Sequence, residues 1–416
     1  MRRSCKGVDL RDPATVEPWV LECLRRHRRR HDFRRLLREV GGLDGPGSED
    51  PSAEELRRAA RAVAGEACRR IAARDLSLPP VTYRERRDPS SGKLRLIGNE
   101  SAMQQVLDYI AVRSCEEVWE RRLVPQQVAG VPGRGAVYCA RMVQGWVDAD
   151  ARAASWARRH GRAWTRRCRW HVKLDVRQCY PSLRVDRFMR LFRRDCANED
   201  ALWLWEELLS SHAVDGYEGF MIGALTSQWA CQYLLSFLYR HATSLAYERR
   251  GRRVRKVAHM ALQMDDLLLV GPSRKGLVSA ARELTRWARD ELGLEIKGGW
   301  HVRRLDRTPI DLAGFRVHAD GAVDVRPRVF LRARRAFLRS LRRGGRTSLA
   351  QARRICAYKG WFIDSGRHRV RSGSKHADSR RAWRRYRLAR VFSAAQRTVS
   401  INERRAHADG MVPVGA

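Results

Sequence analysis

Two adjacent carboxylates, Asp265 and Asp266, stand between two short apolar runs, residues 260–262 and 267–270, in a chain of 416 residues. Ionised carboxylates enter apolar surroundings at a high cost unless a cation or several hydrogen bonds compensate them. The runs are too short for helices, so we expect two strands with the acidic pair at their turn. At such a hairpin tip the pair is able to bind a metal ion, although adjacent aspartates are also common by chance.

A third carboxylate, Asp175, belongs to residues 171–176, where apolar and polar side chains alternate as in a strand. Pro181 and Ser182 then predict the start of a helix that runs to about residue 194. A carboxylate at the end of a strand is a natural ligand for a divalent cation. A loop aspartate without a ligand is the alternative interpretation.

Basic residues accompany these acids at defined positions. Residues 81–97 are predicted to form a hairpin whose return strand places Lys93 and Arg95 on one face. These two side chains either bind phosphate or form a solvated face. Lys297 follows an amphipathic helix over residues 276–293 that ends in glycine.

The remaining elements must position these groups. Ser52 and Glu55 have the spacing of a capping box and predict a helix to about residue 74. Two further helices are expected over residues 101–121 and 137–165, and a strand over residues 310–317. A glycine-rich loop at residues 128–136 is compatible with close backbone approach, but it fits no nucleotide fingerprint.

The net charge points to a polyanionic partner. The chain has 84 Lys and Arg residues against 46 Asp and Glu, a formal charge of +38. Such a charge opposes compaction unless an anion offsets it, and nucleic acid is the expected anion. Most of the basic residues are arginine, which binds phosphate through two parallel hydrogen bonds, although a GC-rich genome also raises the arginine count.

The ten cysteines are scattered and include no C-x-x-C pair. This argues against a zinc knuckle and against a disulfide framework, and it favours reduced thiols in the cytoplasm. The N-terminus has no apolar core of a signal peptide, and no apolar run approaches the roughly 18 residues of a membrane span. We expect a soluble, cytoplasmic protein without a membrane partner.

The order and spacing of these motifs resembles the reverse transcriptases, the RNA-directed DNA polymerases, over about residues 80–320. Asp175 with Tyr180 resembles the first catalytic motif of that family. Residues 263–266 resemble its Tyr-x-Asp-Asp motif, with glutamine in place of the usual tyrosine or apolar residue. Lys297 matches the lysine of the following motif, and Gly314 with Phe315 resembles the primer grip.

The resemblance implies an α+β fold of the right-hand polymerase type, with fingers, a palm containing a small antiparallel sheet, and a helical thumb. The expected division is an N-terminal basic helical extension at 1–80, fingers with part of the palm at 81–170, the catalytic palm at 171–320, a basic helical thumb at 321–400 and a disordered tail at 401–416.

The resemblance also implies roles for individual residues. Asp175, Asp265, Asp266 and Lys297 are the expected catalytic residues. The three aspartates and the main-chain carbonyl of Val176 are expected to bind two Mg²⁺ ions, for which Mn²⁺ can substitute. Tyr180 is expected to exclude a ribose 2′-hydroxyl, with a core tyrosine as the alternative. The expected nucleotide-binding residues are Lys93, Arg95, Tyr180, Ile222, Gly223, Ser227 and Gln228.

One motif points to a subfamily. Most reverse transcriptases carry Pro-Gln-Gly before a palm helix, whereas this chain has Ile222-Gly223 followed by Ser227-Gln228, which resembles the enzymes of diversity-generating retroelements. That subfamily implies error-prone copying of an RNA template from a DNA or RNA primer with dNTPs, a small basic accessory protein and a cognate non-coding RNA. An anti-phage defence, retron or group II-like reverse transcriptase is the alternative enzyme. A catalytically dead scaffold that only binds nucleic acid is the alternative of another class.

Overall fold

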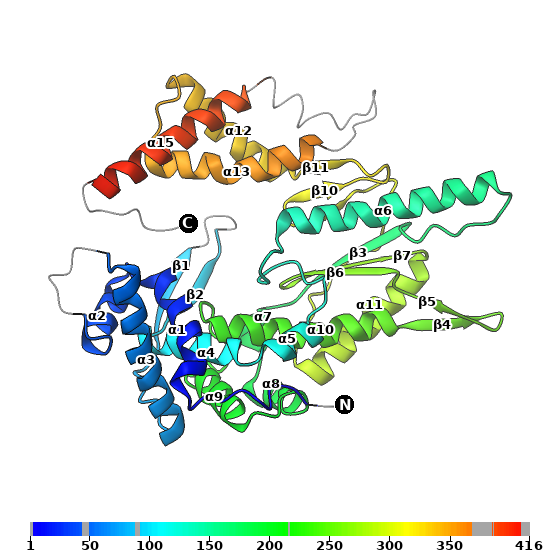
Figure 1. The fold of residues 1–416 in the computed structure, drawn as a ribbon. Helices are drawn as coiled ribbons and strands as arrows, with labels where there is room; N and C mark the ends of the chain where they lie inside the picture. Colours follow the sequence, from blue (N-terminus) through cyan, green and yellow to red (C-terminus); the bar gives the residue numbers. More distant parts are fainter. Residues whose placement is uncertain are drawn as a thin grey trace. The chain divides into compact units, whose positions relative to one another are not determined.

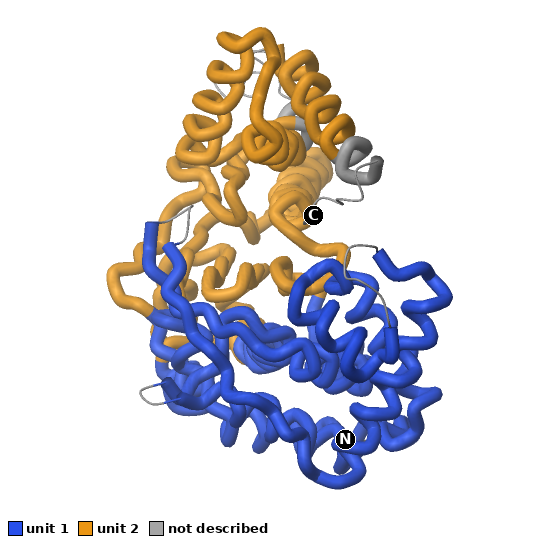
Figure 2. Tube along the Cα trace, turned by 90° about the vertical axis from the view of Figure 1, so that its left-hand side faces the viewer, with its two compact units in different colours: residues 1–124, 176–238, 286–296 blue, residues 125–175, 239–285, 297–416 orange. Residues whose placement is uncertain are grey.

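The computed structural model describes residues 3–43, 50–87, 92–214, 217–367, 385 and 387–408. The chain forms two compact units (Figure 2). Unit 1 comprises residues 1–124, 176–238 and 286–296, and unit 2 comprises residues 125–175, 239–285 and 297–416. Each unit is therefore assembled from three separate segments, and the division into fingers, palm and thumb stays a prediction.

Unit 1 is mainly helical and contains one β-hairpin (Figure 1). Its hairpin is β1 (Thr82–Arg87) and β2 (Leu94–Asn99), paired antiparallel as predicted, with the turn at 88–91 outside the described residues. Its helices are α1 (Pro13–His27), α2 (His31–Glu39), α3 (Ala53–Ala73), α4 (Ala102–Arg113), α5 (Glu116–Arg122), α7 (Cys179–Ser182), α8 (Val185–Phe192) and α9 (Glu199–Ser210), with the first part of α10 (Leu225–Ser244). None of the helices in the described ranges has an apolar stretch long enough to cross a membrane.

Local side-chain hydrogen bonds decide where these helices begin and break. The predicted capping box opens α3: Ser52 Oγ accepts from the Glu55 amide at 3.2 Å, and Glu55 Oε2 accepts from the Ser52 amide at 2.8 Å. The single helix expected over 101–121 is instead α4 and α5, divided at Ser114 and Cys115. Ser114 Oγ donates to the Ala111 carbonyl at 3.0 Å, a backbone-directed bond of the type that bends helices. The helix expected over 181–194 is likewise divided: α7 ends at Ser182, and α8 begins at Val185.

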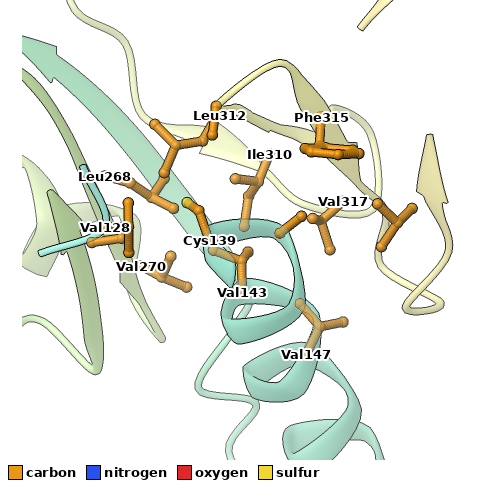
Figure 3. Packing of buried hydrophobic residues seen from close by; sticks show 14 of the residues in the cluster. Val128, Cys139, Val143, Val147, Leu268, Val270, Ile310, Leu312, Phe315 and Val317 are labelled. Atoms are coloured by element: carbon orange, nitrogen blue, oxygen red, sulfur yellow. The ribbon is translucent and has the colours of Figure 1, made fainter. Parts of the chain in front are cut away.

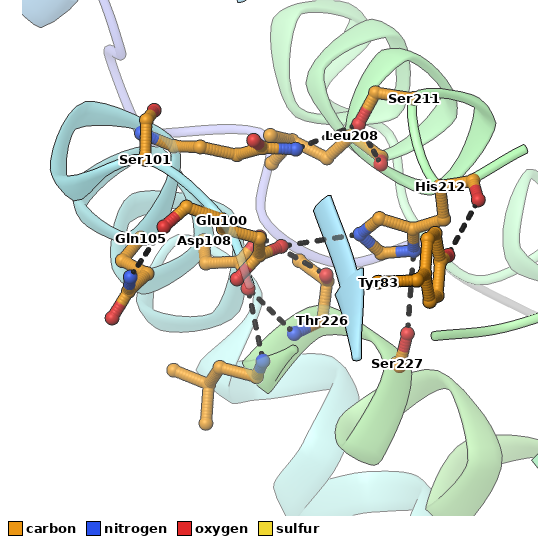
Figure 4. A network of polar contacts seen from close by, with 12 residues as sticks. Tyr83, Glu100, Ser101, Gln105, Asp108, Leu208, Ser211, His212, Thr226 and Ser227 are labelled. Atoms are coloured by element: carbon orange, nitrogen blue, oxygen red, sulfur yellow. Dashed lines mark hydrogen bonds and ion pairs between the residues drawn. The ribbon is translucent and has the colours of Figure 1, made fainter. Parts of the chain in front are cut away.

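A buried polar network holds the start of α10 in unit 1 (Figure 4). Asp108 of α4 accepts from the amides of Leu225 and Thr226 at 2.9 and 3.2 Å and from the Thr226 hydroxyl at 3.0 Å. Asp108 therefore satisfies N–H groups that the first turn of a helix leaves without partners. His212, fully buried, places Nε2 3.2 Å from Glu100 Oε1.

Burial keeps the acid and the imidazole of this network uncharged. It raises the pKa of Glu100 to about 8 and lowers the pKa of His212 to about 4. At neutral pH the two groups therefore form a neutral hydrogen bond and not an ion pair. Burial, with nearby Glu100, also raises the pKa of Asp108 well above its usual range. Desolvation dominates because the pair lies away from water.

Unit 2 contains two antiparallel sheets, a separate hairpin, one long helix and a helical bundle. The first sheet has the strand order β6 (His259–Gln263), β7 (Asp266–Gly271), β3 (Trp170–Asp175) and β8 (Arg303–Arg304), and the second has the order β11 (Val323–Val325), β10 (Phe315–Val317) and β9 (Ile310–Leu312). The hairpin is β4 (Ala246–Arg249) and β5 (Arg252–Arg255). The helices are α6 (Ala136–Arg159), the first part of α11 (Arg274–Leu292), α12 (Pro327–Arg342), α13 (Leu349–Arg367) and α15 (Leu388–Ala408).

Helix α6 and the two sheets share one apolar core (Figure 3). Cys139, Val143 and Val147 repeat at helical spacing on one face of α6 and face the sheet residues, which include Leu268 and Phe315. All of these residues are at most 1% exposed. The long basic helix predicted from residue 137 thus has a continuous apolar face.

The strand expected over residues 310–317 is a tight hairpin. Ala313 and Gly314 both have positive φ, 54° and 86°, and they reverse the chain so that β9 pairs with β10. Consecutive residues with positive φ fit the right-handed twist of a two-residue hairpin. The turn is held further by the Arg326 amide, which donates to the Gly314 carbonyl at 2.8 Å.

The C-terminal part of unit 2 is a helical bundle of α12, α13 and α15 (Figure 1). Its core contains Phe337, Ile355, Phe362 and Phe392, each at most 2% exposed. Residues 401–408, expected to be part of a disordered tail, continue α15, and the rest of that predicted tail lies outside the described residues. The prediction of a disordered tail is therefore wrong for residues 401–408.

The neutral state of Glu100 predicts a specific dependence of stability on pH. The unfolded chain releases the Glu100 proton near pH 4.3, whereas the folded chain keeps it to about pH 8. Between these values the folded state binds more protons, so stability falls as pH rises. Glu100→Gln removes this effect. The free energy of unfolding of the variant minus that of wild type should therefore increase with pH, by up to about 1.4 kcal/mol for each pH unit between pH 5 and 8.

Urea unfolding of both proteins, followed by circular dichroism at several pH values, measures this difference. Glu54→Gln, a change at an exposed carboxyl of α3, is the control and should give a constant difference from wild type. Parallel curves for Glu100→Gln and wild type would contradict the neutral state.

Candidate active site

The acidic hairpin forms as the sequence predicts. β6 and β7 pair from His259 with Val270 to Gln263 with Asp266, which leaves Met264 and Asp265 as a two-residue turn. Met264 adopts the positive φ of 52° that such a turn requires. Residues 260–262 and 267–270 are buried, so the core fixes the hairpin and leaves the acids at its end.

Asp175 and Asp266 face each other across neighbouring strands. β3 pairs with β7 in a register that runs from Trp170 with Gly271 to Asp175 with Asp266. Side chains directly opposite each other in an antiparallel pair lie with Cβ atoms roughly 5 Å apart. Two carboxylates at this distance repel each other, so they need nearby positive charge. Asp265 adds a third carboxyl one residue away, in the turn.

Two lysines supply positive charge at this end of the sheet. Lys173 Nζ lies 2.8 Å from Asp266 Oδ2, and Lys297 forms an ion pair with Asp175 Oδ1. Lys173 lies two residues before Asp175 and so points to the same face of β3. The Lys297 amide donates to the Asp175 carbonyl at 2.9 Å, which fixes this lysine beside the acid through the main chain. The side chains of both pairs are between 27% and 41% exposed and therefore reachable from solvent.

The donors of this site suit a hard divalent cation. Asp175, Asp265 and Asp266 offer carboxylate oxygens, the ligands that Mg²⁺ prefers. A bound cation would replace the lysine ammonium groups as the counter-charge. Val176 follows Asp175 in the chain but belongs to unit 1, where it pairs with Ile296, so its carbonyl remains a predicted ligand.

Unit 1 brings together several of the predicted nucleotide-binding residues. The Gly98 amide of β2 donates to the Ile222 carbonyl at 3.0 Å, and Gly223 packs against the Gly98 carbonyl, with a φ of 128° that favours glycine. The Phe220 amide donates to the Tyr180 carbonyl at 2.9 Å. The loop before α10 thus joins β2, which is preceded by Lys93 and contains Arg95, to α7, which contains Tyr180.

Lys93 and Arg95 of the hairpin are exposed, and Gln228 is half-buried. Ser227 differs from both. Its side chain is fully buried, and its Oγ lies 3.4 Å from His212 Nδ1 in the network of Figure 4. Its hydroxyl therefore belongs to the network that supports α10, and nucleotide binding by Ser227 stays a prediction.

The predicted primer grip divides into a core residue and a turn. Phe315 is 1% exposed and packs in the core of Figure 3, so its contact with a primer stays a prediction. Gly314 lies against the indole Nε1 of Trp361, a buried nitrogen that has no hydrogen-bond partner among the residues that the structure describes. Trp361 lines a hollow of about 530 Å³ in unit 2.

Sequence analysis missed this hollow as a site because its two sides are far apart in the chain. It is lined by residues 133–138 and 141 of the glycine-rich loop and α6 and by residues 357, 360 and 361 of α13. Arg134, Arg141, Tyr138 and Trp361 give it two guanidinium groups and two aromatic rings. Phosphate and base recognition combine these side chains. The glycine-rich loop was the one signal in the sequence.

Gln263 stands where the resemblance expects tyrosine or an apolar residue. Its side-chain oxygen is buried and has no hydrogen-bond partner in the part of the chain that the structure describes. An unsatisfied buried acceptor costs about 1–3 kcal/mol.

Gln263→Met keeps the length of the side chain and removes the acceptor, so we expect a gain of about 1 kcal/mol in the free energy of unfolding. Chemical unfolding of the two proteins measures it. Gln126→Met, on the preceding segment of unit 2, is the control, and a loss of stability in Gln263→Met alone would show that the oxygen is satisfied.

Comparisons with known proteins give no family. No protein-family model and no curated protein matches the chain. Among solved structures, it is similar to telomerase from Candida albicans in complex with the TWJ fragment of telomeric RNA, at 13% identity and a TM-score of 0.39, over 77% of this chain and 60% of that chain. It is also similar to apo telomerase from Candida tropicalis truncated from the C-terminal domain, at 12% identity and a TM-score of 0.39, over 59% of this chain and 54% of that chain. The chain thus spans less than two thirds of either telomerase, and we base the functional conclusion on the geometry of the acidic site.

Proposed function

We propose that the protein is an RNA-directed DNA polymerase whose catalytic acids are Asp175, Asp265 and Asp266. The observation that carries this proposal is the pairing of Asp175 with Asp266 across β3 and β7, with Asp265 in the adjoining turn. Phosphoryl transfer between nucleotides requires carboxylates that converge from separate segments on divalent cations. A net charge of +38 supplies the affinity for the polyanionic template and primer.

The lysines of the site would change partners during turnover. Two Mg²⁺ ions, with Mn²⁺ as a substitute, would activate the primer 3′-hydroxyl and stabilise the leaving pyrophosphate. The three carboxylates would hold them, and Lys173 and Lys297 would release Asp266 and Asp175 on loading. Lys297, freed from Asp175, is then the group beside the site that can donate a proton to pyrophosphate.

The nucleotide contacts follow from the resemblance to reverse transcriptases. Lys93 and Arg95 would bind the triphosphate, and Tyr180 would pack where a ribose 2′-hydroxyl otherwise sits. The half-buried Ile222 and Gly223 would lie against the incoming nucleotide. What supports this set is that the loop of Ile222 and Gly223 is hydrogen-bonded to the strand that contains Arg95.

Basic surfaces of unit 2 support nucleic-acid binding. Arg335, Arg339 and Arg342 of α12 and Arg343, which follows it, are exposed and line one hollow of about 430 Å³. None of these four forms an ion pair with any residue that the structure describes. Arg335 and Arg339 are separated by one helical turn, a rise of about 6 Å, so both can reach phosphates of one backbone.

The subtype that we propose is the error-prone enzyme of a diversity-generating retroelement. Ile222 stands where other reverse transcriptases carry glutamine, so a side-chain amide that hydrogen-bonds the incoming nucleotide is missing. Looser control of base-pair geometry would follow. An RNA template, a DNA or RNA primer, a small basic accessory protein and a cognate non-coding RNA belong to this proposal. An antiviral defence reverse transcriptase is the alternative within the class.

A dead polymerase scaffold that only binds nucleic acid is the second candidate function. The observation in its favour is that both Asp175 and Asp266 are neutralised by lysines in this structure. Such a protein has no requirement for three acids at the end of one hairpin and its neighbouring strand. Substitution of the acids therefore separates the two candidates.

Primer extension on an RNA template with Mg²⁺ and dNTPs tests the catalytic role. Asp175→Asn and Asp265→Asn should each lower the extension rate by at least about 100-fold, because a neutral amide is a poor ligand for Mg²⁺. Template affinity, measured by fluorescence anisotropy, should remain within about twofold of wild type, since non-specific affinity depends on the basic surfaces.

Asp306→Asn is the matched control. Asp306 lies beyond β8, which pairs with the opposite end of β3 from Asp175, and forms an exposed ion pair with Arg304 at 2.8 Å. Its extension rate should equal that of wild type. The absence of extension in wild type, with unchanged affinity in all variants, would establish the binding-only function.

The subtype has its own test. Ile222→Gln restores the side-chain amide and should lower misincorporation opposite template adenines, by roughly the tenfold that about 1.4 kcal/mol of discrimination gives. Sequencing of cDNA made by both proteins on one template measures the rate. Ile222→Leu, which adds no polar group, is the control and should copy with wild-type errors. Equal error rates for all three proteins would reject a role of Ile222 in fidelity.

A further inference from the structure

Three buried cysteines converge in unit 1. Cys5 precedes α1, Cys115 stands between α4 and α5, and Cys196 follows α8, so 110 and 81 residues separate them in sequence. Their exposed fractions are 1%, 0% and 0%. The three Sγ atoms lie within 4.8 Å of one another. This is the one group of at least three potential metal-binding side chains that converges in this way among the described residues.

The backbone around Cys5 is clamped in place. The Ser4 amide donates to the Asp195 carbonyl at 2.7 Å, and the Ala197 amide donates to the Ser4 carbonyl at 2.8 Å, so residue 4 forms a bridge beside Cys196. The Cys5 amide donates to Glu117 Oε2 at 2.8 Å.

Cys5 adopts a strained conformation within this clamp. Its φ is 67°, in the left-handed region that a residue with a Cβ rarely adopts. Asn198 Nδ2 donates to the Cys5 carbonyl at 3.3 Å and to the Val8 carbonyl at 2.5 Å. Strain of this kind persists where the surroundings determine the position of a side chain. Here they hold the Cys5 thiol against two others.

Arg121 contributes positive charge near these three thiols. Thiolates, and not thiols, are the metal ligands.

We propose that Cys5, Cys115 and Cys196 bind one zinc ion as thiolates. Binding releases the three thiol protons. The zinc ion with three thiolates has one net negative charge, or two with Glu117 as the fourth ligand, and the positive charge of Arg121 partly offsets it. Structural zinc has four ligands, and soft thiolate donors favour zinc over the hard cations that carboxylates bind. Glu117, whose carboxylate already contacts the Cys5 amide, or a water molecule supplies the fourth ligand.

The zinc site is separate from the proposed catalytic site. All of its residues belong to unit 1, whereas the three catalytic aspartates belong to unit 2. The ion would join the segment before α1 to α5 and to the segment after α8. These segments also meet through hydrogen bonds of Ser4, Cys5 and Asn198 and through the ion pair of Arg122 with Asp195. Its role is therefore structural, and it neither requires nor supplies polymerase activity.

Metal analysis of the full chain tests the site. Protein purified without chelator should contain about one zinc ion per chain by inductively coupled plasma mass spectrometry. Cys5→Ser, Cys115→Ser and Cys196→Ser should each lose it. Cys68→Ser changes another buried cysteine of unit 1, on α3, that is not part of the cluster, and should keep it. Protein reconstituted with Co²⁺ should show a sulfur-to-cobalt charge-transfer band that the cluster variants lack.

A measurement on wild type removes the dependence on the folding of the cluster variants. Titration of wild-type protein with an organomercurial that binds thiolates should release the zinc into a colorimetric indicator. Wild-type protein that contains no zinc and takes up none when zinc is added would overturn the proposal. So would zinc that all three cluster variants retain, or a disulfide between two of the three cysteines in protein purified under reducing conditions.

Discussion

The register between β3 and β7 is the constraint on which the proposed catalytic site depends. The two strands pair over six consecutive residues, and the last pair is Asp175 with Asp266. Because side chains alternate between faces, a slip of one residue would turn the apolar side chains of 267–270 to the opposite faces. That slip is prevented by the core of Figure 3, to which Leu268 and Val270 contribute. Apolar packing therefore determines the position of the acids, although the acids contribute nothing to the core.

Once the acids are placed, their repulsion must be compensated. Lys173 comes from the same strand as Asp175, and Lys297 is fixed by a main-chain hydrogen bond to it. Half-exposed ion pairs of this kind contribute little to stability, so they can open at low cost when another cation arrives. A fully buried pair would not exchange so readily, because a charge left without its partner in the interior costs several kcal/mol. Partial exposure thus suits a site that must exchange one counter-charge for another.

The sequence predicts the parts of the fold that depend on local pattern. The hairpin around Asp265, the strand that ends at Asp175 and the capping box of Ser52 are all found where residue alternation or spacing places them. Tertiary contacts decide the rest. The burial of Ser227 depends on His212, fifteen residues before it, and Phe315 enters the core because Gly314 reverses the chain. Neither effect has a local signature, so the sequence alone does not predict that these two side chains are buried.

The cluster of Cys5, Cys115 and Cys196 also depends on tertiary contacts that local sequence pattern does not predict. Their spacing argued against a zinc knuckle, and spacing is informative only where the ligands lie on one local motif. Here three segments bring one thiol each, and only folding places them together.

The two proposed metal sites then differ for a physical reason. Carboxylates at a solvent-exposed strand end keep water within reach and suit a hard cation that exchanges, as turnover requires. Thiolates in a dry interior suit a soft cation that stays, because releasing it would leave buried negative charge without compensation. Burial, and not sequence position, thus assigns the exchangeable ions to the aspartates and the permanent one to the cysteines.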